Sequence, residues 1–209
     1  MFNLTREEEK IFKKLDTPAK IQDFLNKIPV NFDYKRDTCM SPRMVLRRWR
    51  CHCIEGAIFS ALALKFHGRK PLIMHFKTSG DDEDHVIAVF MENGKLGAIS
   101  KTNHVVLRYR EPIYNSLREL AMSFFHEYTD KKGNKSLRSY SDLLDLSIFD
   151  KKGWETDEKD LWYIDKHLDK IKHHDILARS QIKNLRKADK IERKVWDLVE
   201  WKMGKGKIN

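Results

Sequence analysis

The sequence lacks the features that define several classes of protein. Its longest apolar run, around residues 56 to 64, is too short to cross a bilayer, so we expect no membrane span. The first residues contain no apolar run followed by a small-residue cleavage site, which argues against a secretory signal. Cysteine is scarce, and three residues, an odd number, do not make a disulfide framework. A reducing, cytoplasmic setting is therefore the expectation.

Internal repeats and a low-complexity basic tail are also absent. The 209 residues carry 41 Lys and Arg against 31 Asp and Glu, a net charge of +10. Because the basic residues are spread among acidic ones, most of this charge is expected to be a solvated surface. The densest basic segment is 34–50, directly before the thiols of Cys51 and Cys53. Nucleic acid therefore remains a weakly supported partner beside a peptide or protein substrate.

The hydrophobic pattern predicts an α+β chain. Residues 1–28 are expected to form two short helices, and Ser41 with Pro42 opens a helical segment that runs to about residue 50. Apolar residues cover almost the whole circumference of the next helix, about 53–67, which places it in the interior. Strands are predicted at 71–78, 85–92 and 95–100, with a fourth candidate at 104–109. Asn93-Gly94 joins two of them as a hairpin, so their pairing is antiparallel.

The second half of the chain returns to helices. A helix is predicted at 116–129, followed by a polar loop at 130–141, and the chain from about Trp162 is expected to be helical and charged. We therefore expect an α+β domain over residues 1–150, in which a central buried helix packs on a small antiparallel sheet. The segment 151–209 should be helical and pack on that domain.

Cys53 begins the buried helix, and this position suits a nucleophile. The start of a helix carries partial positive charge and free N–H donors, which favour a thiolate. The same amides can stabilise an oxyanion that forms when a thiolate attacks an acyl group. A cysteine nucleophile also needs a base and a third group that orients the base. His85 is the candidate base, because it opens a strand after the acidic turn "SGDDED", and the orienting group should come from the neighbouring strand.

The order of these residues resembles a known family. Cys53 at the start of a buried helix, His85 in "DHVIAVF" and the paired strand "GAISKTNH" are similar to the transglutaminase-like branch of the papain-like cysteine enzymes. The segments "CIEGA" and "LRYREP" extend the likeness to bacterial transglutaminase-like proteins with no established substrate. The resemblance, carried by residues 48–104, implies a papain-like fold with a transglutaminase core and a Cys-His-Asp triad.

One position departs from that triad. Where the family places aspartate at the end of the third strand, this chain has Ser100, and Asn103 follows three residues later. Either side chain could orient His85, Ser100 through a weaker hydrogen bond and Asn103 as asparagine does in papain-like enzymes. The catalytic candidates are therefore Cys53, His85, Ser100 and Asn103. Loss of a charged orienting group lowers activity by about four orders of magnitude in serine proteases.

Other residues near Cys53 have simpler interpretations. Trp49, Arg50 and His52 are candidate substrate-binding residues, although Trp49 and Arg50 could equally belong to a solvent-exposed face that one buried indole anchors. Cys39 is expected to be structural, and Cys51 is a neighbour of the nucleophile. A zinc site could draw on Cys51, His52, Cys53, His75 and His85. The C-x-C spacing lacks the two-residue gap of zinc modules, so we expect no metal and no cofactor.

Three functions are compatible with these residues. The first is a cysteine-dependent acyl-transfer enzyme that hydrolyses or transfers an amide or ester. The second is a binding module on the same fold, catalytically inactive at the Ser100 position, that binds a peptide or nucleic acid through the basic segment. The third is plain nucleic-acid binding through the basic surface, with a steep dependence on salt.

Overall fold

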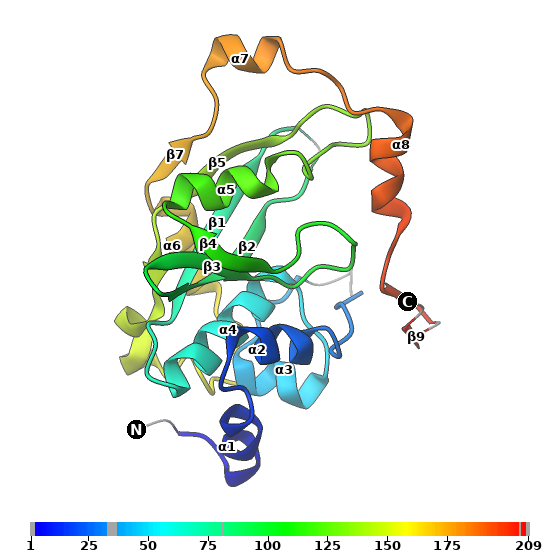
Figure 1. Cartoon of the computed structure of the whole chain (residues 1–209). Coiled ribbons are helices and arrows are strands. Elements are labelled where there is room, and N and C mark those ends of the chain that lie inside the picture. The colour runs from blue at the N-terminus through cyan, green and yellow to red at the C-terminus, as the bar shows by residue number, and fades with distance from the viewer. Residues whose placement is uncertain (1–2, 33–36, 81, 205, 208–209) are drawn as a thin grey trace.

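The computed structural model describes residues 3–32, 37–80, 82–204 and 206–207. Figure 1 shows the helices and strands in chain order. The longer elements are α1 (Arg6–Lys13), α2 (Pro18–Leu25), α3 (Pro42–Arg48), α4 (Cys53–Phe66), β1 (Leu72–Thr78), β2 (His85–Glu92), β3 (Lys95–Ile99), β4 (Arg110–Tyr114), α5 (Leu117–Phe125), β5 (Leu137–Ser141) and α6 (Trp162–Lys170). The shorter ones are β6 (Leu144–Asp145), the 3-10 helix η1 (Leu146–Lys152), β7 (His173–Asp175), α7 (Arg179–Lys183), α8 (Lys190–Arg193), the 3-10 helix η2 (Lys194–Asp197), β8 (Trp201–Lys202) and β9 (Gly206–Lys207).

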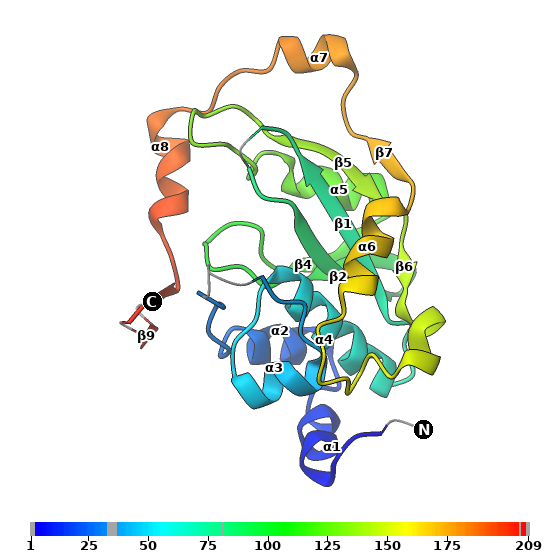
Figure 2. The ribbon, with the colours of Figure 1, turned by 180° about the vertical axis from the view of Figure 1, so that it is seen from behind.

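An antiparallel sheet of seven strands forms the centre of the molecule. Its order is β4-β3-β2-β1-β5-β7, and β6 pairs with β1 beside this path. Helices α1 to α4 lie on one side of the sheet and α5 lies on the other (Figure 1). Figure 2 shows that α6 lies on the same face of the sheet as α4. The apolar residues of α6 belong to the same hydrophobic core as those of α4. The mixed α+β fold with an antiparallel sheet and several helices is confirmed.

Strand β2 is buried on both faces, which explains its unbroken apolar run. Val86, Ala88 and Phe90 pack toward α4, whereas Ile87 and Val89 pack toward α5. Successive side chains of a strand point to opposite faces, so a strand with two covered faces needs apolar residues at every position. The sequence "HVIAVF" satisfies this requirement and places His85 at the start of a strand whose first six residues are buried.

Helix α4 is the interior helix that its apolar circumference predicted. Every residue from Glu55 to Leu64 is buried. The rings of Phe12 and Phe24, from α1 and α2, pack on Phe59 with centroid distances of 5.2 and 5.4 Å. Among the described residues no helix has both the length and the apolar character needed to span a membrane.

The predicted hairpin between β2 and β3 is confirmed, and its turn is of the expected kind. Asn93 and Gly94 have φ angles of 49° and 74°. Positive φ at both central residues is the geometry of a type I′ turn, which matches the twist of the strands on either side. Five residue pairs, from Ala88↔Ile99 to Glu92↔Lys95, set the register that places the end of β3 beside the start of β2.

Two predictions in the middle of the chain are wrong. The candidate strand at 104–109 is a loop with Leu107 at φ 60°, and the strand starts only at Arg110. The backbone of Leu107 forms hydrogen bonds with side chains and not with a neighbouring strand. Its N–H donates to Glu127, and its carbonyl accepts from Ser100. The predicted polar loop at 130–141 contains β5, whose polar residues gain their strand partners from β1 and β7.

The chain after α6 is far less helical than predicted. The helices that remain, α7 and α8, have five and four residues, and β7 pairs with β5. Apolar residues of this part, including Leu177, Leu185 and Trp196, pack at separate points on the core beneath α5. Tertiary contacts of this kind override helix propensity, because one continuous helix could not reach all of these points.

Candidate functional site

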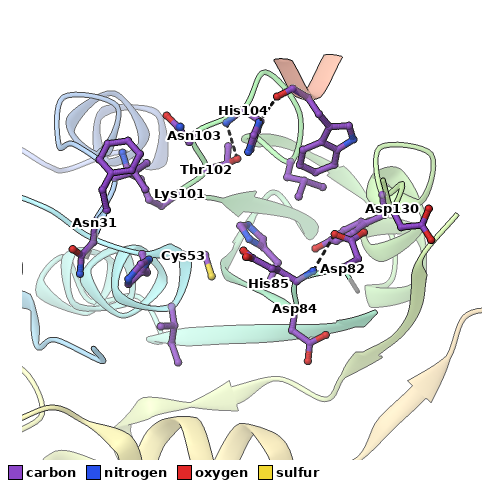
Figure 3. Close-up of a pocket in the computed structure, with 18 of the residues that line it drawn as sticks. Asn31, Cys53, Asp82, Asp84, His85, Lys101, Thr102, Asn103, His104 and Asp130 are labelled. Atoms are coloured by element: carbon purple, nitrogen blue, oxygen red, sulfur yellow. Dashed lines mark hydrogen bonds between the residues drawn. The ribbon is translucent and has the colours of Figure 1, made fainter. Parts of the chain in front are cut away.

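A cavity of about 1260 Å³ opens where the start of α4 meets the ends of β2 and β3. Cys53, His85 and Tyr128 line it, together with residues of the surrounding loops, of α6 and of the C-terminal segment. Figure 3 shows the Cys53 sulfur and the His85 ring close to one another, with Asp82, Asp84, Lys101 and His104 around them. The residues of the predicted nucleophile and base therefore share one cavity.

Cys53 is the first residue of α4 and is half-buried. Burial raises the pKa of its thiol from 9.0 to about 11, although the backbone N–H groups of Val86 and Ile54 hydrogen-bond to the sulfur and act in the opposite direction. The predicted effect of the helix start is present but smaller than the cost of removing the anion from water. The hydrogen bond from Val86 also shows that the sulfur reaches β2 one residue after His85.

The start of α4 is held by a buried carboxylate. Glu55 accepts hydrogen bonds from the backbone N–H of His52 at 2.6 Å, the backbone N–H of Met40 at 2.9 Å and the hydroxyl of Thr38 at 2.6 Å. Burial raises the pKa of Glu55, and these hydrogen bonds oppose that rise. Glu55 thus connects the segment before α3 to the turn that presents Cys53, which is a structural function.

Gly56 allows the chain after β3 to approach the helix start. A Cβ atom at position 56 would lie 2.4 Å from the Cβ of Lys101, a distance that side chains do not tolerate. The Lys101 ammonium is buried and donates to the carbonyls of Ile28 and Leu25, the latter at 3.0 Å. Burial lowers the pKa of Lys101. The glycine of "CIEGA" therefore serves the packing that brings the residues after β3 to Cys53.

His85 is buried and its Nε2 atom lies 2.8 Å from the Ser100 hydroxyl. That hydroxyl donates its one proton to the carbonyl of Leu107 at 2.5 Å, so it must accept from His85. Nε2 therefore carries the imidazole proton and Nδ1 carries the lone pair. This is the tautomer in which Nδ1 can accept a proton from a thiol.

Ser100 is held in place by a side chain from α2. The Gln22 amide accepts from the Ser100 N–H and donates to the Ser100 carbonyl, each at 2.9 Å. Together with the contact to Leu107, these bonds fix the hydroxyl that His85 meets. Gln22 is a residue of the candidate site that the sequence did not indicate, because a contact across 78 positions leaves no local signal.

The thiol and the imidazole are both uncharged in this structure at neutral pH. Burial, and to a smaller extent the charge of His75, lowers the pKa of His85 to about 4. With the pKa of Cys53 near 11, a neutral thiol beside a neutral imidazole is favoured over a thiolate-imidazolium pair. In the part of the chain that the structure describes, no hydrogen bond joins the Cys53 sulfur to the imidazole.

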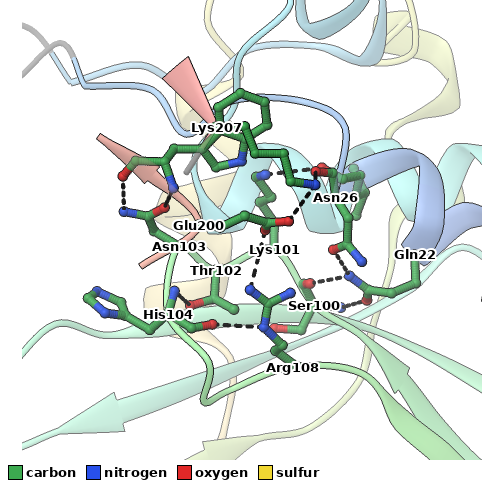
Figure 4. Close-up of polar contacts among 12 residues, drawn as sticks. Gln22, Asn26, Ser100, Lys101, Thr102, Asn103, His104, Arg108, Glu200 and Lys207 are labelled. Atoms are coloured by element: carbon green, nitrogen blue, oxygen red, sulfur yellow. Dashed lines mark hydrogen bonds and ion pairs between the residues drawn. The ribbon is translucent and has the colours of Figure 1, made fainter. Parts of the chain in front are cut away.

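Asn103, the other candidate for the orienting group, lies elsewhere. Its amide exchanges two hydrogen bonds with the backbone of Trp201, at 3.1 and 2.9 Å. Asn103 lines the cavity but its amide is directed to the C-terminal segment, whereas Ser100 meets His85. Figure 4 shows the hydrogen bonds of the Asn103 amide. Beside them lie the ion pairs that Glu200 makes with Arg108 and Lys207, at 3.3 and 2.9 Å.

The C-terminal segment 188–201 contributes to one wall of the cavity, through Lys190, Arg193, Lys194, Trp196 and Asp197. The Trp196 indole donates to the Thr129 hydroxyl at 3.0 Å, and the Trp196 carbonyl lies 2.9 Å from His104 Nδ1. The Glu200 N–H donates to the carbonyl of Asn103 at 2.8 Å. Residues more than 60 positions apart thus close this side of the site.

The three candidate substrate-binding residues are separated. His52 lines the cavity, whereas Trp49 and Arg50 are not among the described residues that line it. Trp49 ends α3 in the left-handed conformation, with φ 50°, and this turn directs its ring onto Phe24 at 5.6 Å. Trp49 therefore belongs to a solvent-exposed face, but its indole is itself exposed, so the expectation of a buried indole that anchors this face is wrong.

The basic segment before the thiols is partly neutralised by acidic residues. Arg43 forms two hydrogen bonds with Glu8, at 2.8 and 2.9 Å, and Arg47 contacts Glu158 at 2.5 Å. Residues 34–36 of this segment lie outside the described residues. The remaining charge is less concentrated than the sequence indicated.

The other two cysteines are buried in the core. Burial raises the pKa of Cys51 to about 12 and that of Cys39 still further. Both pack in the core around α4. Within the described ranges, no group of three His, Cys, Asp or Glu side chains is arranged to hold a metal ion.

Comparisons with known proteins add no identification to this geometry. No protein-family model matches the chain, and no curated protein matches it.

Proposed function

We propose that this protein is a cysteine-dependent acyl-transfer enzyme in which Cys53 is the nucleophile and His85 the base. The observation that carries the proposal is the hydrogen-bond relay from His85 Nε2 through Ser100 to the carbonyl of Leu107. This relay leaves the Nδ1 lone pair free to act in the cavity that holds the thiol. Ser100 orients the base, and Gln22 positions Ser100.

The reaction begins from the neutral pair. The Cys53 sulfur forms a bond to the carbonyl carbon of an ester or amide as its proton moves to His85 Nδ1. Catalytic hydrogen bonds are often long without substrate and shorten in the complex, which is when the thiol and imidazole must meet. The carbon-to-leaving-group bond then breaks, and the imidazolium returns the proton to the leaving group. Water attacks the thioester in a second, similar step and releases Cys53.

Water is the expected acceptor. True transglutamination requires exclusion of water from the acyl-enzyme, and a cavity of about 1260 Å³ has room for water beside a substrate. A peptide or protein amide is the substrate class that the family resemblance implies. Three features support a papain-like fold with a transglutaminase core. They are the cysteine at the start of a helix, the histidine at the start of a strand, and the paired strand that leads to Ser100. The serine in place of aspartate departs from that family.

The test is whether an acyl group is transferred to Cys53. p-Nitrophenyl acetate reports acylation by release of p-nitrophenolate, and peptide mass mapping locates the acetyl group. We expect a burst with acetyl on Cys53, and loss of both in Cys53→Ala. Cys51→Ala is the matched control and should keep the burst, because Cys51 is buried in the core two residues away. Acetyl on lysines alone, or an equal burst in Cys53→Ala, would contradict the proposal.

A second candidate function is a binding module on the same fold. The observation that favours it is the neutral resting site, in which the orienting group is an uncharged serine and the pKa of the thiol is raised. Such a module would bind a peptide or nucleic acid in the cavity or along the basic segment without covalent chemistry. Two results together would favour this second function: the Cys53→Ala variant retains all binding, and the parent chain shows no acylation of Cys53.

A further inference from the structure

Tyr128 carries a buried hydroxyl that the hydrogen bonds of the fold do not use. The residue follows α5 and is 1 % exposed, and its ring packs edge-on against Phe76 with a centroid distance of 6.3 Å. Among the described residues its hydroxyl oxygen has no hydrogen-bond partner. Buried polar groups are nearly always paired in native proteins, so an unpaired one calls for a functional explanation.

The location of this hydroxyl supplies the explanation. Tyr128 lines the same cavity as Cys53 and His85. Burial, together with the negative charges of ionised Cys53 and of Asp82, raises the pKa of the hydroxyl well above 10.0. The group therefore stays protonated over the whole working range of pH and acts as a donor. A donor that shares a cavity with a nucleophile and has no partner in the resting protein is available to an anionic group of a substrate.

We infer that the Tyr128 hydroxyl donates a hydrogen bond to the acyl oxygen that becomes negative when Cys53 attacks a carbonyl. This inference rests on the proposed function and adds a catalytic residue to it. Tyr128 loses no proton in the step, since it only shares its hydrogen with the oxyanion while His85 takes the thiol proton. A donor fixed in place before reaction favours the transition state, because little reorganisation is needed when the charge develops.

Tyr163, a half-buried tyrosine whose hydroxyl oxygen is also buried without a partner, provides a matched control. Tyr163 in α6 also has no hydrogen-bond partner for its hydroxyl among the described residues, but it packs against Phe149 and does not line the cavity. Replacement of either tyrosine by phenylalanine removes one oxygen atom and no hydrogen bond. Both variants should therefore fold like the parent chain.

Two reagents separate a donor to the oxyanion from a residue that merely shapes the cavity. p-Nitrophenyl acetate acylates Cys53 through a tetrahedral oxyanion, whereas iodoacetamide alkylates the same sulfur by displacement and forms no oxyanion. For Tyr128→Phe we expect acetylation to slow by a factor on the order of 100. Alkylation by iodoacetamide should stay within about twofold of the parent, as should both reactions of Tyr163→Phe.

The outcomes are distinguishable. Acetylation of Cys53 at the same rate in Tyr128→Phe and the parent chain would overturn this inference and leave the proposed function intact. Equal slowing of acetylation and alkylation would also overturn it, because that result assigns Tyr128 to the shape of the site. Absence of Cys53 acetylation in the parent chain would overturn the proposed function together with this inference.

Discussion

The His85 imidazole donates from Nε2 to the hydroxyl of Ser100 across 2.8 Å, and that hydroxyl donates onward to a backbone carbonyl. The side chain that contacts the imidazole is therefore neutral, and its own proton is used in a second hydrogen bond. An uncharged partner fixes the tautomer of an imidazole but gives little stabilisation to an imidazolium. Ser100 therefore does not offset the burial that leaves both the thiol and the imidazole without charge.

A carboxylate at position 100 should charge the site. In Ser100→Asp, an anion beside His85 should raise the pKa of the imidazole by about 1 to 3 units, since an adjacent opposite charge favours the protonated form. The imidazolium should in turn favour the Cys53 thiolate, so alkylation by iodoacetamide at pH 7 should accelerate at least about tenfold. NMR titration of His85 and the alkylation rate measure the two effects.

Ser100→Asn is the matched control for that variant, because asparagine has the size of aspartate without its charge. It should leave both the pKa of His85 and the alkylation rate near those of the parent. Identical titration of His85 in the parent chain and both variants would show that position 100 does not control the charge of the base.

Gln22 should stabilise the fold as well as the site. Gln22→Leu removes the amide that pairs with the N–H and the carbonyl of Ser100, which leaves two buried backbone groups without partners. We expect the free energy of unfolding to fall by about 3 kcal/mol, as unpaired buried groups cost about 1 to 3 kcal/mol each. Urea unfolding measures the loss. Gln181→Leu, at an exposed residue of α7, should change stability by less than about 1 kcal/mol; equal losses in both variants would contradict the account.

The lowered pKa of His85 makes the fold less stable in acid. Between its ordinary value of 6.5 and about 4, the unfolded chain binds a proton at this residue that the folded chain does not. Stability must therefore fall as pH decreases through that window. The shift corresponds to about 3 kcal/mol, since one pKa unit is worth about 1.4 kcal/mol.

His85→Gln tests this linkage because it removes the titrating group. Urea unfolding at pH 6.5 and pH 4 should show a stability loss for the parent chain that is larger than the loss for His85→Gln by about 3 kcal/mol. Other titrating groups contribute to both proteins and cancel in this difference. If the two proteins lose the same stability between these pH values, the imidazole is not held neutral by burial.

The sequence was sufficient to predict those helices, strands and turns that are determined by residues adjacent in the chain. The apolar circumference of 53–67, the alternation that begins at His85 and the Asn93-Gly94 turn each depend on residues adjacent in the chain. These signals sufficed to place Cys53 at a helix start and His85 at a strand start. They also named Ser100 as one of two partners for the imidazole.

Long-range packing determined the remainder. The tie from Gln22 to Ser100 and the C-terminal wall of the cavity join residues far apart in sequence. Strand β5 exists only because β1 and β7 supply its partners, so the polar sequence "LRSYS" carries no strand signal of its own. The pKa of Cys53 likewise depends on its burial in the folded chain, which outweighs the effect of the helix start that the sequence indicated.

The most direct test of the account is the rate at which p-nitrophenyl acetate acylates Cys53 between pH 4 and pH 9. If His85 takes the proton during attack, the rate should be nearly constant above about pH 5, because a base whose pKa is about 4 is then available throughout. In His85→Gln the reaction should depend on free thiolate and rise about tenfold for each pH unit, since the pKa of the thiol lies near 11. A tenfold rise for each unit in the parent chain, matching His85→Gln, would contradict the claim that the two residues act together.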